Sequence, residues 1–401
     1  MATGLRAQQA LINLKADSAV EMVATLVQRA VETRATDIHL EPRRNGYQIR
    51  YRVDGFLYIV AEIDENMGRE IVSRIKILAD MDITERRLPQ DGHFRFSTPT
   101  AEYDMRIATV PTHFGERMEI RLAEGGKVFS SVEDLGMSEA DVEIVNSFVA
   151  NPHGIVLATG PVGSGKTSTL YSCISRIDRD SVNVMTIEDP IEYIIPGANQ
   201  IEVNYRVDFD FVNGLRAILR QDPNVILVGE IRDEETARIA IRAGMTGMLV
   251  FSTLHANHAV GAVTTLFNFN ISRFLIANAL VGAMAQRLVR KVCPECQASV
   301  KPNDAAARAL GVKKEQMKNW NMVRGEGCEE CFFTGYRGRT GIFEIFQVTP
   351  EIRTLIMNGA TEAELQAETQ AQGMTSLRKS GMEKVKSGMT TVEEVVRVLG
   401  Q

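Results

Sequence analysis

The chain has 401 residues and a formal charge of −6 at pH 7, because 51 acidic residues outnumber 45 Lys and Arg. Hydrophobic residues make up 44% of it and charged residues 24%, which excludes disordered and fibrous proteins. At about 100–200 residues per domain, the length predicts two or three domains. The acidic balance argues against a surface that follows a nucleic-acid backbone or a polybasic membrane anchor.

The sequence shows no export or membrane signal. The first fifteen residues lack the apolar stretch of a secretory signal, so we expect a cytoplasmic chain. The most apolar segment, Phe274 to Ala285, is shorter than the ~20 residues that cross a bilayer. We interpret this segment as a buried helix, with helical structure continuing through Arg290.

The first 126 residues have the pattern of a small α+β domain. Asp17-Ser18 predicts the start of an amphipathic helix, and Asp54-Gly55 between alternating apolar residues predicts a two-residue hairpin. A second helix is expected over Met67 to Asp80, followed by the strands HFRFS, YDMRIATV and RMEIRLA. The order predicts an antiparallel sheet, with a domain boundary near Glu124-Gly125-Gly126.

Residues 127–290 alternate between apolar strands and helices, which predicts an α/β core with a buried parallel sheet. The expected strands are GIVLAT, VNVMTIE, VILVGE and MLVFST, and the expected helices begin at Lys166 or span Phe209–Arg220 and Glu234–Ala243. A cysteine-containing segment, 291–348, follows this core. Residues 349–401 predict a cluster of short helices with N-caps at Thr349, Thr361 and Thr391.

The segment GPVGSGKT, residues 160–167, matches the phosphate-binding pattern G-x-x-x-x-G-K-[ST] between a predicted strand and a predicted helix. In this setting the glycines let backbone amides wrap phosphates, Lys166 reaches the β/γ oxygens and Thr167 ligates Mg²⁺. A glycine-rich turn that matches by chance is the alternative. The residues predicted to bind ATP and Mg²⁺ are Gly160, Gly163, Ser164, Gly165, Lys166, Thr167, Ser168 and Glu192.

Acidic residues follow the next strand, where ligands bind in open α/β sheets. Glu188, Asp189 and Glu192 belong to TIEDPIEY and are candidates to hold magnesium or water, although a solvated acidic turn is the alternative. The strand VILVGE has Gly229 where a Walker B aspartate is usual, which leaves Glu230 to polarise the attacking water. His255 ends the following strand and is a candidate sensor of the γ-phosphate.

Four of the five cysteines form two C-x-x-C pairs, Cys293/Cys296 and Cys328/Cys331, separated by 31 residues. Four thiolates in two such pairs predict a structural tetrahedral Zn²⁺ site without an open coordination position. Four reduced, unligated cysteines are the alternative. Cys173 stands alone in a predicted helix.

Over nearly its whole length the chain resembles the ATPases of type II secretion and type IV pilus assembly. The matching segments include ETRATDIHLEP, RLPQDGHF, GERMEIRL, GPVGSGKTSTLY, TIEDPIEY, ILRQDPNVILVGEIRDEETARIAIRAGMTGMLVFSTLHAN and CEECFFTGYRGRTGIFEIF. The resemblance implies a RecA-like P-loop NTPase core with an N-terminal α+β (PAS-like) domain, a zinc-binding insertion and a C-terminal helical subdomain. In family terms TIEDPIEY is the Asp box, Glu230 the Walker B glutamate and His255 the His box, and Gly229 is normal. The family's assembly members often carry a further N-terminal domain, which we expect this chain to lack.

The same resemblance implies a homohexameric ring with ATP between one subunit's motor domain and the small domain of its neighbour. It implies catalytic roles for Glu188, for Arg106 in YDMRIATV and for Arg121 in GERMEIRL, the two arginines reaching the neighbour's phosphates. His93 departs from the family pattern, which has arginine there, and Arg95 on the same strand face could take part of that role. The implied partner is an inner-membrane platform protein, with membrane contact only through partners and no nucleic acid.

Three other functions remain open. RecA-like motors also translocate nucleic acid, and a scaffold that binds ATP but barely hydrolyses it would share the P-loop. A pilus-retraction ATPase is the third alternative, but its branch generally lacks the two cysteine pairs.

Overall fold

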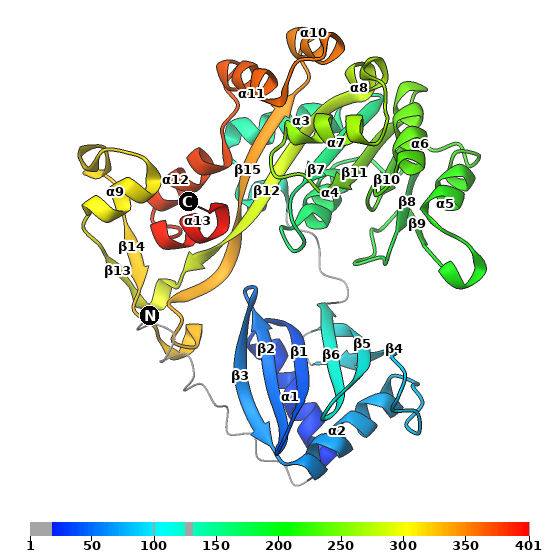
Figure 1. Cartoon of the computed structure of the whole chain (residues 1–401), viewed down its shortest axis with the longest axis vertical. Coiled ribbons are helices and arrows are strands. Elements are labelled where there is room, and N and C mark those ends of the chain that lie inside the picture. Colours follow the sequence, from blue (N-terminus) through cyan, green and yellow to red (C-terminus); the bar gives the residue numbers. More distant parts are fainter. Residues whose placement is uncertain (1–17, 99–100, 125–130, 401) are drawn as a thin grey trace. The chain divides into compact units, whose positions relative to one another are not determined.

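The computed structural model of the protein describes residues 18–98, 101–124 and 131–400, which form two compact units (Figure 1). The first contains the described part of Met1–Lys127 together with Val292–Ala298 and Gly325–Gly338. The second contains the described part of Val128–Lys291 with Ser299–Arg324 and Arg339–Gln401. The four-part division expected from the sequence stays a prediction.

The first unit has an antiparallel sheet with the strand order β3-β2-β1-β6-β5-β4. Its elements are α1 (Ala19–Glu32), β1 (Ala35–Arg43), β2 (Gly46–Val53), β3 (Phe56–Ile63), α2 (Glu65–Leu78), β4 (Gln90–Ser97), β5 (Glu102–Thr112) and β6 (Gly115–Glu124). The two helices bury their apolar faces against one side of the sheet, where Val27, Ile49 and Ile71 are fully buried. This arrangement confirms the predicted α+β domain.

Local signals in this unit act as expected. Ser18 caps α1 by accepting a hydrogen bond from the Glu21 amide, whereas Asp17 lies outside the described residues. Asp54 and Gly55 have φ of +48° and +89°, as the tight hairpin between β2 and β3 requires. Of the predicted boundary residues, Gly125 and Gly126 also lie outside the described part of the chain.

The second unit has a seven-stranded sheet with the order β15-β12-β7-β11-β10-β8-β9. The strands are β7 (Gly154–Thr159), β8 (Val184–Glu188), β9 (Asn199–Glu202), β10 (Val225–Val228), β11 (Leu249–Leu254), β12 (Leu280–Val292) and β15 (Tyr336–Gln347). The four predicted strands, β7, β8, β10 and β11, pair in parallel as expected, and β12 and β9, which were not predicted, extend the parallel part of the sheet on its two sides.

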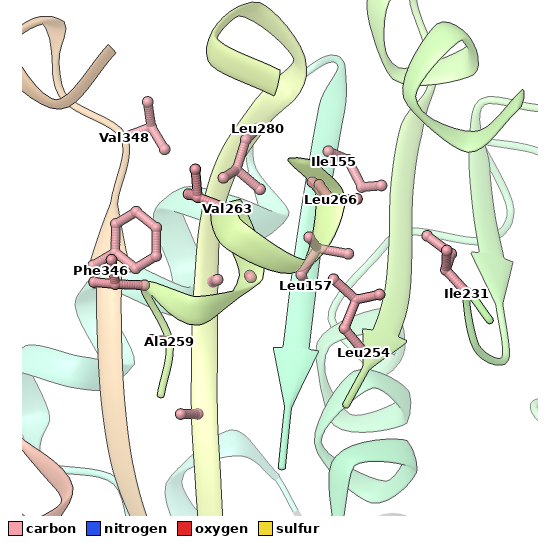
Figure 2. Close-up of a cluster of buried hydrophobic side chains, with 14 of the residues drawn as sticks. Ile155, Leu157, Ile231, Leu254, Ala259, Val263, Leu266, Leu280, Phe346 and Val348 are labelled. Atoms are coloured by element: carbon pink, nitrogen blue, oxygen red, sulfur yellow. The ribbon is translucent and has the colours of Figure 1, made fainter. Parts of the chain in front are cut away.

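Helices cover both faces of this sheet because its central strands are apolar on both sides. One face packs against α3 (Glu139–Val149) and α4 (Lys166–Ser175). The other packs against α5 (Phe211–Ile218), α6 (Glu234–Met245), α7 (Gly261–Asn268) and α8 (Arg273–Ala279). Figure 2 shows part of the core between the sheet and helices α5–α8, where Leu157 of β7, Leu254 of β11 and Leu266 of α7 belong to one buried cluster.

The helix predicted over Phe274–Ala285 and through Arg290 is wrong in its second half. α8 ends at Ala279, and Leu280–Val292 form strand β12 beside β7. An apolar run that is buried on all sides has no periodicity that distinguishes a helix from a central strand. The segments that pack beside it therefore determine which of the two it forms. On its other side β12 meets β15 in antiparallel order, because the Val348 amide donates to Val281 O and the Cys293 amide to Gly335 O.

The rest of the chain is built from short elements. β13 (Gln297–Ser299) pairs with β14 (Val323–Gly325), α9 spans Asp304–Leu310, and the C-terminal helices are α10 (Pro350–Asn358), α11 (Glu362–Ala371), α12 (Leu377–Lys386) and α13 (Val392–Leu399). The predicted caps Thr349, Thr361 and Thr391 each accept a backbone hydrogen bond. Among the helices of the described residues, none is both long and apolar enough to cross a membrane.

Candidate active site and metal centre

The predicted phosphate-binding loop connects β7 to α4 at the carboxyl edge of the sheet. Gly160, Gly163 and Gly165 have φ of +146°, +75° and +89°, which favour glycine. A Cβ at Gly160 would lie 2.7 Å from Gln286 O, and a Cβ at Gly165 would lie 2.7 Å from Gln286 Nε2. The loop is therefore pressed against β12, and its path depends on glycine at both positions.

Lys166 begins α4 and spans the loop. Its Nζ donates to Gly160 O at 2.8 Å and to Pro161 O at 3.2 Å. Burial lowers the pKa of Lys166, and attraction to Glu230 opposes that effect. Thr167 and Ser168 follow in the first turn of α4, and Ser164 is buried in the loop. The loop, the ammonium group and the helix N-terminus fit a phosphate ligand.

Glu230 and His255 come from the ends of two neighbouring strands, β10 and β11. His255 Nε2 lies 3.5 Å from Glu230 Oε2, so the structure brings these two predicted site residues together. Arg232, which the sequence reading missed, forms an ion pair with Glu230 and lies 3.8 Å from Asp189 Oδ2. Its hydrogen bond to Glu230 raises the pKa of Arg232. The missed signal was a cation two residues beyond the Walker B glutamate.

Glu188 lies deeper than the sequence suggested. Only 2% of the residue is exposed, and its carboxylate accepts hydrogen bonds from Tyr171 Oη, Thr186 Oγ1 and Gln200 Nε2. Burial raises the pKa of Glu188, and the hydrogen bonds oppose the shift. Glu192, four residues on, is exposed. The two carboxylates therefore occupy different environments.

The backbone explains the glycine in the Walker B element. A Cβ at Gly229 would lie 3.3 Å from Glu188 Cα and 3.3 Å from Ile187 O, both on β8. The Gly229 amide also donates to Ile187 O at 2.8 Å. An aspartate at this position would press on the neighbouring strand, so the carboxylates near the site come from other positions.

The candidate arginines lie in the first unit, on the sheet face opposite its helices. Arg106 of β5 pairs in register with His93 of β4 and with Arg121 of β6. Arg121 Nε donates to Asp37 Oδ1 at 3.2 Å, and Arg106 Nε lies 3.7 Å from Asp104 Oδ2.

The four cysteines of the two C-x-x-C pairs converge in the first unit, and their sulfur atoms all lie within 4.8 Å of one another. The Sγ–Sγ distances are 3.9 Å for Cys293–Cys328, 3.8 Å for Cys296–Cys331 and 3.7 Å for Cys328–Cys331. Zn–S bonds of about 2.3 Å place the corners of a tetrahedron about 3.8 Å apart, so the cluster fits zinc.

Backbone amides complete the environment of this cluster. Gly327 N lies 3.3 Å from Cys296 Sγ, and Gly335 N lies 3.3 Å from Cys331 Sγ. Amide donors of this kind stabilise thiolates, the form that binds zinc.

Comparison with known proteins matches residues 13–397 to the family described as type II/IV secretion system protein. The type II secretion system protein HxcR of Pseudomonas aeruginosa is 44% identical over 379 residues, which cover 94% of this chain and 77% of that protein. The type IV pilus assembly ATPase PilB of Thermus thermophilus is 41% identical over 385 residues, 96% of this chain and 43% of that protein.

Solved structures share the fold. The ATPase DotB of Legionella pneumophila superposes with a TM-score of 0.71 at 19% identity, over 96% of this chain and 97% of that one. The pilus retraction motor PilT, with bound ADP, gives a TM-score of 0.61 at 24% identity, over 93% and 95% of the two chains. With the extent of the family match and the identity to HxcR, these findings establish that the chain belongs to the type II/IV secretion system protein family, the ATPases of type II secretion and type IV pilus assembly.

Proposed function

We propose that this chain hydrolyses ATP to ADP and phosphate and converts the energy into domain movement that powers type II secretion or type IV pilus assembly. The observation that carries the proposal is the Glu230–His255 pair, 3.5 Å apart, at the sheet edge that also holds Lys166. A carboxylate can accept a proton from the attacking water, while Lys166 neutralises phosphate charge. Thr167 is the residue that would hold Mg²⁺, which would help neutralise phosphate charge when bound.

We assign different roles to the acidic residues. Glu230 is the general base, and His255 is a γ-phosphate contact. Glu188 is buried, its carboxylate accepts three hydrogen bonds, and we assign it a supporting role next to the site. Glu192 is exposed, and we assign it a contact with the bound nucleotide. The hydrogen bonds that Glu188 accepts from Tyr171, Thr186 and Gln200 support a role in ordering this edge of the sheet rather than in replacing Glu230 as the base.

The working assembly in this proposal is a cytoplasmic homohexamer. Arg106 and Arg121 of one subunit approach the phosphates bound by its neighbour, and the ring acts on an inner-membrane platform protein. Zn²⁺ held by the four cysteines is structural, because four thiolates leave no position for substrate. The names of the relatives, which include secretion proteins and a pilus assembly ATPase, support a role in a secretion or pilus assembly machine.

ATP hydrolysis by the purified chain tests the proposal. We expect Lys166→Ala to lower the rate at least about a hundredfold, because it removes phosphate neutralisation. Lys291→Ala, which removes an exposed charge on β12, is the matched control and is expected to retain the rate. Single- and double-stranded DNA are added in parallel. Stimulation of about tenfold by DNA would favour a translocase instead, and an active Lys166→Ala would refute the P-loop assignment.

A further inference from the structure

The segment that follows His255, residues 256–260, is held by three adjacent strands. We name it the His255 loop. Three consecutive residues of its backbone each meet one strand of the set β7, β12 and β15, which are neighbours in the sheet. The contacts are Arg287 Nη2 to Asn257 O at 3.1 Å, Thr159 Oγ1 to His258 O at 3.4 Å, and Ala259 N to Glu344 Oε1 at 2.9 Å.

Glu344 is a carboxylate buried in the second unit, with 1% of the residue exposed. Besides the Ala259 amide it faces the ring of His258, whose Nδ1 lies 4.0 Å from Glu344 Oε2, and the guanidinium group of Arg287. Burial lowers the pKa of Arg287, and attraction to Glu344 opposes that shift. A carboxylate so deeply buried is costly unless its partners are fixed. The loop is thereby tied to β15 by a bond that water cannot easily replace.

Apolar packing also holds the His255 loop in place at Ala259. Ala259 is fully buried, in the same cluster as Phe346, which lies two residues beyond Glu344 on β15 (Figure 2). A shift of the loop would break the amide–carboxylate bond and open this core together. The backbone four residues after His255 is therefore rigidly positioned.

Arg287 extends the tie to the phosphate-binding loop. Its Nη1 donates to Gln286 O at 3.0 Å, and Nη1 lies 3.2 Å from the position that a Cβ on Gly160 would occupy. One guanidinium thus contacts the His255 loop and lies against the first glycine of the phosphate-binding loop. Its planar shape allows both contacts at once, which an ammonium cannot reproduce.

We propose that Arg287 and Glu344 are positioning residues that set His255 against Glu230 and the phosphate-binding loop. This inference rests on the proposed ATP hydrolysis. Neither residue contacts Glu230 or His255 in the described structure; both act on the backbone of the His255 loop. Loss of Glu344 should therefore lower kcat while nucleotide binding, which depends on Lys166 and the glycines, remains. Loss of Arg287, which lies against Gly160 and acts on the charge of Lys166, should lower kcat and also change nucleotide binding.

The test uses Glu344→Gln and Arg287→Lys in the full chain. Each is expected to lower kcat by about tenfold to a hundredfold, because misplacement of about 1 Å costs that much. For Glu344→Gln, KM and the affinity for a fluorescent ATP analogue should stay within about threefold. The matched controls are Gln347→Ala on β15 and Lys291→Ala on β12, both exposed, and both should retain kcat.

A double-mutant cycle with His255→Ala separates positioning from general destabilisation. If the two residues act through His255, adding Glu344→Gln or Arg287→Lys to His255→Ala lowers kcat no further. The same fold loss with and without His255 would overturn the proposal, as would unchanged kcat in both single variants. Melting temperatures show whether Glu344→Gln or Arg287→Lys fails to fold. If one of them does, the kcat values of the other variant test the proposal. If the wild-type chain hydrolyses no ATP, or Lys166→Ala hydrolyses it normally, the proposed function itself fails.

Discussion

Arg106 of β5 lies directly opposite Arg121 of β6, so two guanidinium groups occupy neighbouring positions on one face of the N-terminal sheet. His93 continues the row on β4 and Asp37 continues it on β1. Like charges in direct register repel each other. Asp37 and Asp104 offset part of this repulsion, and a phosphate would offset more.

This row predicts complementation between subunits. In the proposed hexamer, Arg121→Ala and Glu230→Gln should each lose most ATPase activity, since one removes the proposed contact to the neighbour's phosphates and the other the proposed general base. Mixing the two inactive proteins and allowing subunits to exchange should restore activity, because some interfaces then combine an intact Arg121 with an intact Glu230. An Arg121→Ala chain that stays fully active, or a mixture with no activity, would contradict the contact between subunits.

The cysteine cluster predicts one Zn²⁺ per chain. Elemental analysis of freshly purified, reduced protein should find it, and Cys296→Ser should lower both the zinc content and the melting temperature. Cys173→Ser is the matched control, because Cys173 is buried in α4 and is not one of the four clustered cysteines, and should leave the zinc in place. Metal-free wild-type protein, or equal zinc loss in both variants, would refute the site.

Glu394 predicts how the stability of the second unit depends on pH. Burial alone would raise the pKa of Glu394, but hydrogen bonds from Arg397 and Arg290 hold it at about 2. An unfolded glutamate has a pKa of about 4.3, so the ionised form stabilises the fold by about 3 kcal/mol above that pH. This contribution is lost as pH falls from about 4.3 towards 2.

Glu394→Gln should therefore lower the melting temperature at pH 7, and the difference from wild type should shrink below about pH 4. Glu383→Gln is the control, because its pair with Lys386 on α12 is exposed and worth little. A melting difference that stays constant from pH 7 to pH 3 would show that the charge of Glu394 is not what stabilises the C-terminal helices.

Local signals explain what the sequence could predict. The glycines of the phosphate-binding loop, the Asp54-Gly55 hairpin and the three threonine caps each require a particular residue at a particular backbone conformation, so they are legible without tertiary structure. The cysteine pairs are equally legible because only a few residue types bind zinc in that spacing.

Contacts between distant segments could not be predicted in this way. The sequence of β12 alone predicts a helix, and its strand conformation follows from its pairing with β7 and β15. The burial of Glu188 depends on donors from α4 and β9, and the role of Glu344 depends on a loop 85 residues earlier in the chain. Nothing in the sequence around these carboxylates reports their partners.

The central claim, that Glu230 activates the attacking water, is tested most directly by ADP formation in a single turnover. Wild-type chain and Glu230→Gln are each mixed in excess with ATP and Mg²⁺, and bound ATP and ADP are quantified over time. We expect Glu230→Gln to bind ATP as tightly as wild type but to form ADP at least about a hundredfold more slowly, because only the proton acceptor is lost. ADP formation at the wild-type rate would contradict the account and transfer the role of base to Glu188.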